Sequence, residues 1–534
     1  MKKKLLILLL LTGMIPMSCT DDFDELNTDP TKASGTSFDP NLLLPSVQWR
    51  YVNATAGYNG GILFQSMWVQ ILASTTSGAA NYYSNADKYV ISSNTNSYLA
   101  SAWNTDYSAA SFAYEMEQLT KDKPALSNLM NTAIIMQVQS LATISDIYGD
   151  LPYTDALKAK DAITLPAYDT QESVYKSLLT RLDAAITGLD ASKPLVTNDA
   201  FANYKGDVAK WKKYGYSLML KMAMRLVKVD LATAKTYAEK AAAGGTFTSV
   251  SDDAYVVSDD ANGYTNGNGA ALSTPADVYQ VRWSKTMIDF LKSTNDPRLG
   301  VVAEVPVAGL AGSQNVAAGS SDPAIQMGLP NGYDLNGGAT DISRSPGYNG
   351  ASGSGADITP IGKYSRPTGV YRSRSAPLFV QTYAETELLL AEAVTRGFSV
   401  GTTTAAAHYA NGVSAGIQSL ARYGATATIS AAVADAYAAA HPLVAADALK
   451  QINEQYWAVN GTLFNFVEAW NNWKRSGYPV LTPVNYVGNF SGGVIPRRQV
   501  YPTTEATLNA ANYNAAVGRI SGGDIWSARN WWDK

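Results

Sequence analysis

Apolar residues recur at helical spacing along most of the chain, whereas strict alternation of apolar and polar residues is scarce and short. Ile134, Val138, Leu141 and Tyr148 share one face of a predicted helix that ends at Gly149, a residue type that often terminates helices. The same spacing occurs near 41–57, 61–74, 97–120, 172–189, 208–228, 231–243, 276–292, 377–396, 403–423, 443–459 and 462–473. The body is therefore predicted to be mainly α-helical.

The window 377–396 is apolar on nearly every side, apart from Glu385, Glu387 and Glu392. A helix without a continuous polar face is usually enclosed by other helices. We therefore expect this one to lie in the interior.

Three long stretches, 249–275, 296–375 and 478–524, are rich in Gly, Asn, Asp and Ser. Turn-forming pairs such as Asn331-Gly332 bend the chain tightly and leave room for a few short strands. Loops longer than about 15 residues are uncommon in compact domains and are often functional, so we expect the ligand site here. No Ser-, Thr- or Pro-rich linker divides the chain, which favours one domain over residues 36–534.

The first residues have the pattern of a secretory signal. A basic segment with Lys2, Lys3 and Lys4 precedes an apolar run, Leu5–Leu11, that is too short to span a bilayer, and Cys19 follows. The arrangement resembles a bacterial lipobox, which predicts a lipoprotein signal peptide over residues 1–18 and acylation of Cys19. Pro16 and Met17 depart from the usual lipobox residues, so an ordinary signal peptide with an incidental cysteine is the alternative.

Residues 20–25 carry four carboxylates directly after the cysteine. They resemble the acidic signal that directs Bacteroidetes lipoproteins to the outer leaflet of the outer membrane. The same charges would also keep a plain linker solvated and extended. We interpret residues 19–35 as an acidic surface tether and expect a lipid-anchored protein at the cell surface.

Composition limits the classes of function. With 46% apolar residues the chain can bury a large core, and 41 Lys and Arg against 45 Asp and Glu leave it mildly acidic. No basic run follows residue 4, which argues against nucleic acid as a partner. Two histidines and one cysteine argue against thiol catalysis, Cys/His zinc sites and disulfides.

Motifs for cofactors are also lacking. No Walker loop is present, and the Gly-x-Gly stretches at 267–269 and 353–355 lack the third glycine of a dinucleotide site. Residues 334–337 superficially resemble the start of a calcium loop without its spaced oxygens or closing Glu. We expect no cofactor and leave Ca²⁺ open, together with a carboxylate pair for glycoside hydrolysis, because such pairs converge only in space.

Four stretches together resemble the SusD/RagB family of outer-membrane, nutrient-binding lipoproteins. Residues 145–156 match its D-x-Y-G-x-x-P-Y-x-x-A segment, and 295–299 match its D-P-R-L turn. Residues 455–479 resemble its long helix ending in E-A-W-x-D-W-R-R-T-G-Y-P, with mild departures at 472, 474 and 476. The fourth stretch contains residues 495–505 and the C-terminal residues 522–533. We interpret these motifs as scaffold, since helix stops, aromatic residues and Arg–carboxylate pairs hold a helical array together.

The resemblance implies a TPR-like scaffold of helix pairs with long irregular loops and a few short strands. It also implies a role without catalysis: a surface lipoprotein that captures an oligosaccharide, or in some relatives a peptide, and closes over a SusC-like TonB-dependent transporter. A surface glycoside hydrolase and a purely structural surface protein are the competing classes.

Tyrosine and tryptophan are the candidate ligand contacts, because a sugar ring stacks on an aromatic face while planar polar groups bind its hydroxyls. The chain has 32 Tyr and 11 Trp against 12 Phe. The favoured run begins at Trp68 and interleaves tyrosines with Asn81, Asn85 and Asp87. The candidates are Trp68, Tyr82, Tyr83, Tyr89, Trp103, Trp283, Tyr333 and Tyr348. For each of them, packing against the scaffold is the alternative.

Overall fold

The computed structural model describes residues 38–75, 82–91, 95–273, 280–306, 319–350 and 361–534. Residues 41–534 form one compact unit, to which the elements below belong. The predicted signal peptide, Cys19 and the acidic tether lie outside the described residues.

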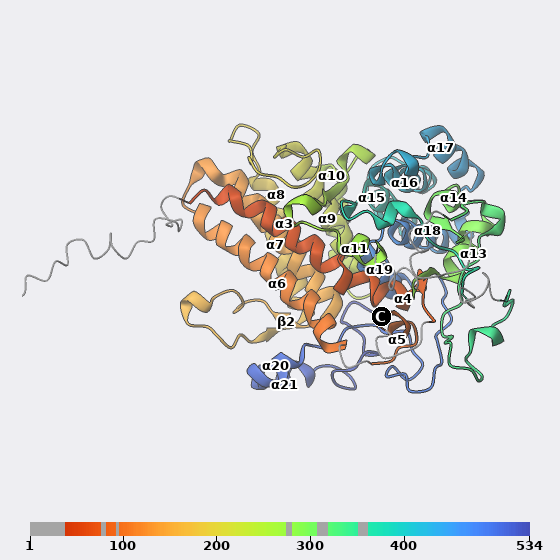
Figure 1. Ribbon diagram of the computed structural model, residues 1–534. Helices are drawn as coiled ribbons and strands as arrows, with labels where there is room; N and C mark the ends of the chain where they lie inside the picture. Colours follow the sequence, from red (N-terminus) through yellow and green to blue (C-terminus); the bar gives the residue numbers. More distant parts are fainter. Residues whose placement is uncertain (1–37, 76–81, 92–94, 274–279, 307–318, 351–360) are drawn as a thin grey trace, which may run out of the picture. The chain divides into compact units, whose positions relative to one another are not determined.

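Long helices dominate this unit, as the apolar spacing predicts. In the first half, neighbours in the chain pack side by side from α6 to α10, and α3 packs on α6 (Figure 1). In the second half, α15 packs against α9, α16 and α18, and α19 packs on α18. The long helices are α3 (Leu44–Thr55), α6 (Thr95–Thr120), α7 (Ser127–Tyr148), α8 (Gln171–Gly188), α9 (Val208–Arg225), α10 (Leu231–Gly244), α15 (Tyr383–Thr395), α16 (Ala405–Gln418), α17 (Ala431–Ala440), α18 (Ala448–Thr462) and α19 (Phe466–Ser476).

Local sequence signals explain where these helices begin and end. The side chain of Thr170 caps α8, and Thr382 forms a capping box with Glu385 at the start of α15. Gly149 ends α7 with a φ of 93°, and Gly477 ends α19 with a φ of 83°. Positive φ values are costly for residues with a Cβ, which explains glycine at both stops.

Short elements connect the long helices. They are α4 (Gln65–Trp68), α5 (Tyr82–Asp87), α11 (Gly267–Ser273), α13 (Lys285–Ser293), α14 (Leu299–Val302), α20 (Thr503–Leu508) and α21 (Ala510–Val517). Four antiparallel ribbons of two strands each complete the described chain. They pair β1 (Leu72–Ala73) with β5 (Arg282–Trp283), β2 (Leu151–Pro152) with β3 (Tyr168–Asp169), β4 (Ala254–Val257) with β8 (Pro377–Gln381), and β6 (Ala303–Glu304) with β7 (Arg366–Pro367).

Some windows predicted as helix contain other structure. Residues 61–74 contain the end of a π-helical turn (Tyr58–Ile62), the short α4 and then β1, and residues 377–381 form β8 before α15 begins. A short apolar run fits a buried strand as well as a buried helix, so spacing could not distinguish them. The expectation that 377–396 lies in the interior is confirmed, because Glu385 and Glu392 are fully buried.

The family motifs meet in the core. Asp146 accepts hydrogen bonds from Trp532 Nε1 at 3.0 Å and from the Tyr175 hydroxyl, and its backbone oxygen accepts one from Lys474 Nζ at 2.5 Å. In the D-P-R-L turn, the fully buried Arg298 pairs with Asp296. The motifs are therefore scaffold, as the sequence indicated, and they join segments that are far apart in the chain.

Among the described residues, no single helix combines the length and apolar content needed to cross a bilayer. The stretches Ala425–Ala440 and Ala445–Thr462 reach that composition only as a pair, and they are bent by 96°.

Candidate ligand-binding groove

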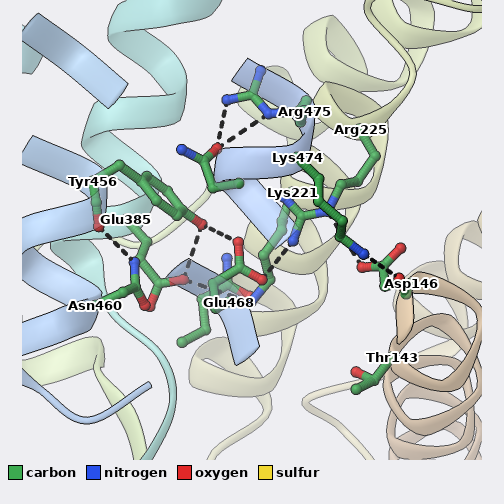
Figure 2. A network of polar contacts seen from close by, with 12 residues as sticks. Thr143, Asp146, Lys221, Arg225, Glu385, Tyr456, Asn460, Glu468, Lys474 and Arg475 are labelled. Atoms are coloured by element: carbon green, nitrogen blue, oxygen red, sulfur yellow. Dashed lines mark hydrogen bonds and ion pairs between the residues drawn. The ribbon is translucent and has the colours of Figure 1, made fainter. Parts of the chain in front are cut away.

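A network of charged side chains is buried where α7, α9, α15, α18 and α19 meet (Figure 2). The Tyr456 hydroxyl lies 2.6 Å from Glu468 Oε1 and 3.1 Å from Glu385 Oε2. Arg225 Nη2 lies 2.5 Å from Glu468 Oε2, and Lys221 Nζ lies 3.7 Å from Glu385. Glu385 and Glu468 therefore both contact the Tyr456 hydroxyl, and Lys221 and Arg225 offset their negative charges.

Burial raises the pKa of Glu385. Burial acts in the same direction on Glu468, but the Arg225 guanidinium outweighs it and holds the pKa of Glu468 below its ordinary value. Two carboxyl groups with pKa values pushed apart are typical of acid/base pairs in catalysis. However, the adjoining cavity measures only ≈ 20 Å³, which is enough for a water molecule and far too small for a sugar ring. In the described conformation a sugar therefore has no room beside Glu468, which lines this cavity.

A groove open to solvent lies elsewhere, where two of the irregular segments meet the start of α13 and Gln70. Its volume is ≈ 490 Å³, within the usual range of ligand sites. One wall is the start of α13, with Lys285, Thr286 and Asp289. The facing walls are residues 330–340 and 482–485, and Gln70 closes the remaining side.

Hydrogen bonds fix the first facing wall of the groove to the scaffold. Asn331 Nδ2 donates to the backbone oxygen of Leu72 at 3.0 Å and to Asp87 Oδ1 at 2.5 Å. The backbone N–H of Gly332 donates to Asp87 Oδ2 at 2.7 Å. Burial raises the pKa of Asp87, while the adjacent Lys88 ammonium opposes that shift. Asp87 thus supports the groove from beneath.

Gln70 and Tyr89 hold the second facing wall. Gln70 Nε2 donates to the backbone oxygen of Thr482 at 2.6 Å, and the Thr286 hydroxyl donates to Gln70 Oε1 at 3.0 Å. The backbone N–H of Val484 donates to the Tyr89 hydroxyl at 3.4 Å. Side chains held in this way need little ordering when a ligand binds, which favours affinity.

The groove combines the two kinds of group that bind sugars. Tyr333 is half-buried and gives an aromatic ring to the lining. Asn331, Asn485 and Gln70 add side-chain amides, and Asp289 adds an exposed carboxylate that pairs with Lys285. Such a surface can bind a polar ligand with a flat apolar face.

Five of the eight predicted aromatic contacts belong to the core instead. Their rings are occupied by protein: Trp68 packs on Trp470 and Trp526, and Trp283 donates from Nε1 to the backbone oxygen of Val302. Trp103 stands among Tyr107, Tyr148, Tyr168 and Tyr501. Relative exposures are 0% for Trp68, Tyr83, Tyr89 and Trp283 and 5% for Trp103. The structure corrects the prediction for these five, because a ligand cannot reach their ring faces in this conformation.

Tyr82, Tyr333 and Tyr348 are half-buried. Tyr333 lines the groove, and Tyr348 packs with it against the small core cluster around Leu329 and Ile342. Tyr82 lies on α5, with its ring edge-to-face against Tyr98 and a cavity of only ≈ 10 Å³ beside it. The structure thus brings Tyr333 and Tyr348 to one region and leaves Tyr82 apart from the groove.

The sequence pattern predicted Asn85 and Asp87 beside the ligand, and it did not indicate several polar residues of the groove. Asp87 is fully buried beneath the Asn331-Gly332 turn, Asn85 lines the small cavity at Tyr82, and Asn81 lies outside the described residues. The missed polar residues are Gln70, Thr286, Asp289, Asn331 and Asn485. The Asn331-Gly332 pair was the one sequence signal in this region. It predicted a tight turn, but it could not show which residues the turn would face.

The calcium-like stretch at 334–337 is closed by its own hydrogen bonds. Asp334 Oδ2 accepts from the Tyr486 hydroxyl at 2.6 Å and from Thr340 Oγ1 at 2.9 Å, and Asp334 Oδ1 accepts from the backbone N–H of Asn336 at 3.1 Å. In the part of the chain that the structure describes, no three His, Cys, Asp or Glu residues gather as a metal site would require.

A family model described as SusD-like, starch-binding and associating with the outer membrane matches residues 33–502. No curated protein matches the chain by sequence.

Solved structures similar to the chain share its fold. A chitin-binding protein is 30% identical, with a TM-score of 0.76, and the match covers 93% of this chain and all of the other. A chitin-binding SusD homologue from Flavobacterium johnsoniae is 23% identical with a TM-score of 0.68, over 94% and 98% of the two chains. A SusD-like protein from Bacteroides thetaiotaomicron is 21% identical with a TM-score of 0.69, over 93% and 99%.

Proposed function

Because this chain belongs to the SusD-like family, whose members are associated with the outer membrane, we propose that it binds a glycan at the cell surface and passes it on unaltered. The ligand we propose is an oligosaccharide of N-acetylglucosamine, as derived from chitin. Support for this ligand comes from the chitin-binding protein that is 30% identical over nearly the whole chain.

The observation that carries the proposal is the groove at Tyr333. Its ring lies among side-chain amides from three segments of the chain, and the volume of ≈ 490 Å³ accommodates a short oligosaccharide. The acetamido groups of such a ligand both donate and accept hydrogen bonds, which the amides of Asn331 and Asn485 can satisfy. Peptide is the competing ligand class, and a binding screen distinguishes the two.

Capture without chemistry agrees with the described carboxylates. Glu468 lines a cavity too small for a sugar, and Glu385, whose pKa is shifted in the opposite direction, contacts the same Tyr456 hydroxyl. We propose that the purified protein releases no reducing ends from chitin oligosaccharides that it binds.

A SusC-like TonB-dependent transporter is the proposed recipient of the glycan. An acyl anchor on Cys19 would hold both partners on one membrane and raise their effective local concentration. The pair would then need only modest affinity in solution. Co-purification of a large outer-membrane barrel with the protein tests this part of the proposal.

Replacing Tyr333 by alanine should weaken binding of the N-acetylglucosamine hexasaccharide about tenfold, equivalent to about 1.4 kcal/mol. The ring loses its stacking contact, while the backbone hydrogen bonds of the neighbouring turn remain. Calorimetric titration of the full-length protein in detergent measures the effect.

Tyr82→Ala is the matched control, since Tyr82 is also half-buried but does not line the groove. It should leave the hexasaccharide affinity unchanged. Equal losses of hexasaccharide affinity in the two variants would overturn the assignment of the site. Tight binding of peptides instead of the glycan would overturn the assignment of the ligand.

Cys19→Ala should move the protein from the membrane fraction to the soluble fraction. Each buried CH₂ of an acyl chain contributes ~0.8 kcal/mol to membrane binding, so several chains anchor a protein firmly. Fractionation followed by immunoblotting measures the shift, with Ser18→Ala as the neighbouring control. A variant that stayed with the membrane would contradict acylation at Cys19 as the anchor.

A further inference from the structure

A second cavity shares no lining residue with the groove. It has a volume of ≈ 360 Å³ and lies where the end of α7, the start of α8 and the C-terminal segment meet. Its lining includes Gly149, Gln171, Arg519, Asn530 and Trp531. Two of the family motifs therefore contribute to a space that their scaffold role does not explain.

The walls of this cavity are fixed by hydrogen bonds and ion pairs. Asp150 Oδ1 accepts from the backbone N–H of Gln171 at 2.8 Å, and Asp150 Oδ2 lies 2.6 Å from Arg519 Nε. Arg498 Nη2 donates to the backbone oxygen of Tyr148 at 2.8 Å. The cavity is therefore bounded by groups that its own scaffold holds in place.

One polar atom at the wall has no partner among the described residues. Asn530 is only 4% exposed, and its Nδ2 donates to the backbone oxygen of Asp146 at 2.7 Å. Its Oδ1 accepts no hydrogen bond. A Cβ placed on Gly149, another lining residue, would lie 3.1 Å from this oxygen, so a side chain at this position would crowd it. A buried polar atom without a partner is costly, which favours an occupant that donates a hydrogen bond.

The charges of the lining favour a neutral occupant. Arg519 pairs with Asp150, Arg529 with Asp533, and Arg498 with Asp524. Each of these guanidinium groups is already paired, so an anion would have to compete with a carboxylate of the protein for it. The lining also includes the exposed side chains of Glu172 and Lys534, one charge of each sign. A hydroxyl-bearing ligand can instead hydrogen-bond to groups of both signs and donate to Asn530.

Trp531 gives the lining of the cavity an aromatic surface. Its indole is half-buried and lines the cavity together with Ile520. The volume lies near the lower end of the ~300–1,000 Å³ usual for ligand pockets, which suits one or two sugar units. From the indole, the planar polar groups and the unpartnered acceptor, we infer that this cavity is a second carbohydrate site, taking a neutral pyranose. The inference shares only its ligand class with the proposed groove.

The test uses full-length protein in detergent, labelled with 5-fluorotryptophan and observed by ¹⁹F NMR. Trp531→Phe identifies the Trp531 signal by its disappearance. N-Acetylglucosamine is then added to ~50 mM, far above the ~1 mM dissociation constant that corresponds to about 4.1 kcal/mol of binding. A saturable shift of the Trp531 signal is expected.

Two variants locate the effect. Ser521 is exposed and lines the cavity, so Ser521→Phe fills the space without removing a scaffold contact, and it should abolish the shift. Tyr333→Ala alters only the groove and should leave the Trp531 shift intact.

A silent Trp531 signal, or a shift that persists in Ser521→Phe, would mean that the cavity holds only water, and the inference would fall. A Ser521-dependent shift with sodium sulfate but not with the sugar would also overturn it, in favour of an anion. Hexasaccharide binding that depends on Tyr333 would still stand in these cases. Conversely, if the Trp531 signal shifts with the sugar but the groove binds no glycan, only the proposed function is overturned.

Discussion

Replacing Arg475 by methionine should lower the free energy of unfolding by about 3 kcal/mol, within the range observed when one partner of a buried ion pair is removed. Arg475 is 1% exposed and binds Glu392 through two contacts of 2.6 Å each. It also donates to Asn453 Oδ1 at 2.9 Å and to Asn472 Oδ1 at 2.7 Å. Methionine would fill part of the space but leave these buried acceptors without their main donor.

The loss should be partial because Arg396 Nε still lies 2.7 Å from Glu392 Oε1. It should also depend on pH. Burial would raise the pKa of Glu392, but Arg475 and Arg396 hold it at about 2 in the folded protein, below its ordinary value of 4.5. This carboxylate therefore adds stability above pH 4.5, and the contribution disappears as the pH falls towards 2. As the pH falls from 4.5 towards 2, the free energy of unfolding should therefore decrease less in the variant than in the wild type.

Chemical denaturation followed by circular dichroism measures both effects. Arg374→Met is the matched control, since Arg374 pairs with Asp260 on the surface with half of its side chain exposed. Exposed pairs contribute about 0–1 kcal/mol, so this variant should remain close to the wild type. Equal losses in the two variants would show that burial of the Arg475 network does not determine its contribution.

Asp106→Asn should make the protein more stable at neutral pH and flatten its pH dependence. Asp106 lies on α6 with 0% exposure, and neither of its carboxyl oxygens has a hydrogen-bond partner among the described residues. Tyr51 and Tyr148 are near enough for its charge to raise their pKa values. The Tyr148 hydroxyl donates to the backbone oxygen of Leu99 at 2.5 Å, and Tyr51 is engaged by Gln139 at 2.7 Å.

Desolvation raises the pKa of Asp106 well above its ordinary value. The folded protein then keeps a proton that the unfolded chain releases, so stability falls as the pH rises from the unfolded pKa towards the folded one. The slope is about 1.4 kcal/mol for each pH unit in that interval. Asparagine carries no such proton, so the advantage of the variant should grow along the same interval and vanish in acid.

Denaturation midpoints measured from pH 4 to pH 8 test this prediction. Asp122→Asn is the control, because Asp122 is exposed just beyond the end of α6. Glu385 and other buried carboxyl groups are present in both proteins, so their titration cancels in the comparison. A constant difference between Asp106→Asn and wild type across the pH range would show that Asp106 does not retain its proton in the fold.

The scaffold was largely predictable from the chain because its signals are local. The face formed by Val138, Leu141 and Tyr148 and the stop at Gly149 identified α7 almost to its last residue. The runs at 61–74 and 377–381 were predicted as helix, but the first contains the short α4 before β1 and the second forms β8, because pairing with β5 and β4 involves residues far away in the chain. Residue chemistry predicted the motifs to be scaffold, whereas the contact between Asp146 and Trp532 depends on the tertiary structure.

The ligand site was likewise predictable only in part. The sequence by itself determined the helical class, the family and the kind of group that a glycan site requires, since spacing, motifs and residue chemistry are properties of the chain. Only the tertiary structure decided which aromatic residues remain accessible: Tyr333 reaches the groove, whereas Trp68 and Trp283 are fully buried. The physical reason is that an amphipathic ring is equally suited to a core and to a sugar, and its role depends on how many neighbours the fold brings against it.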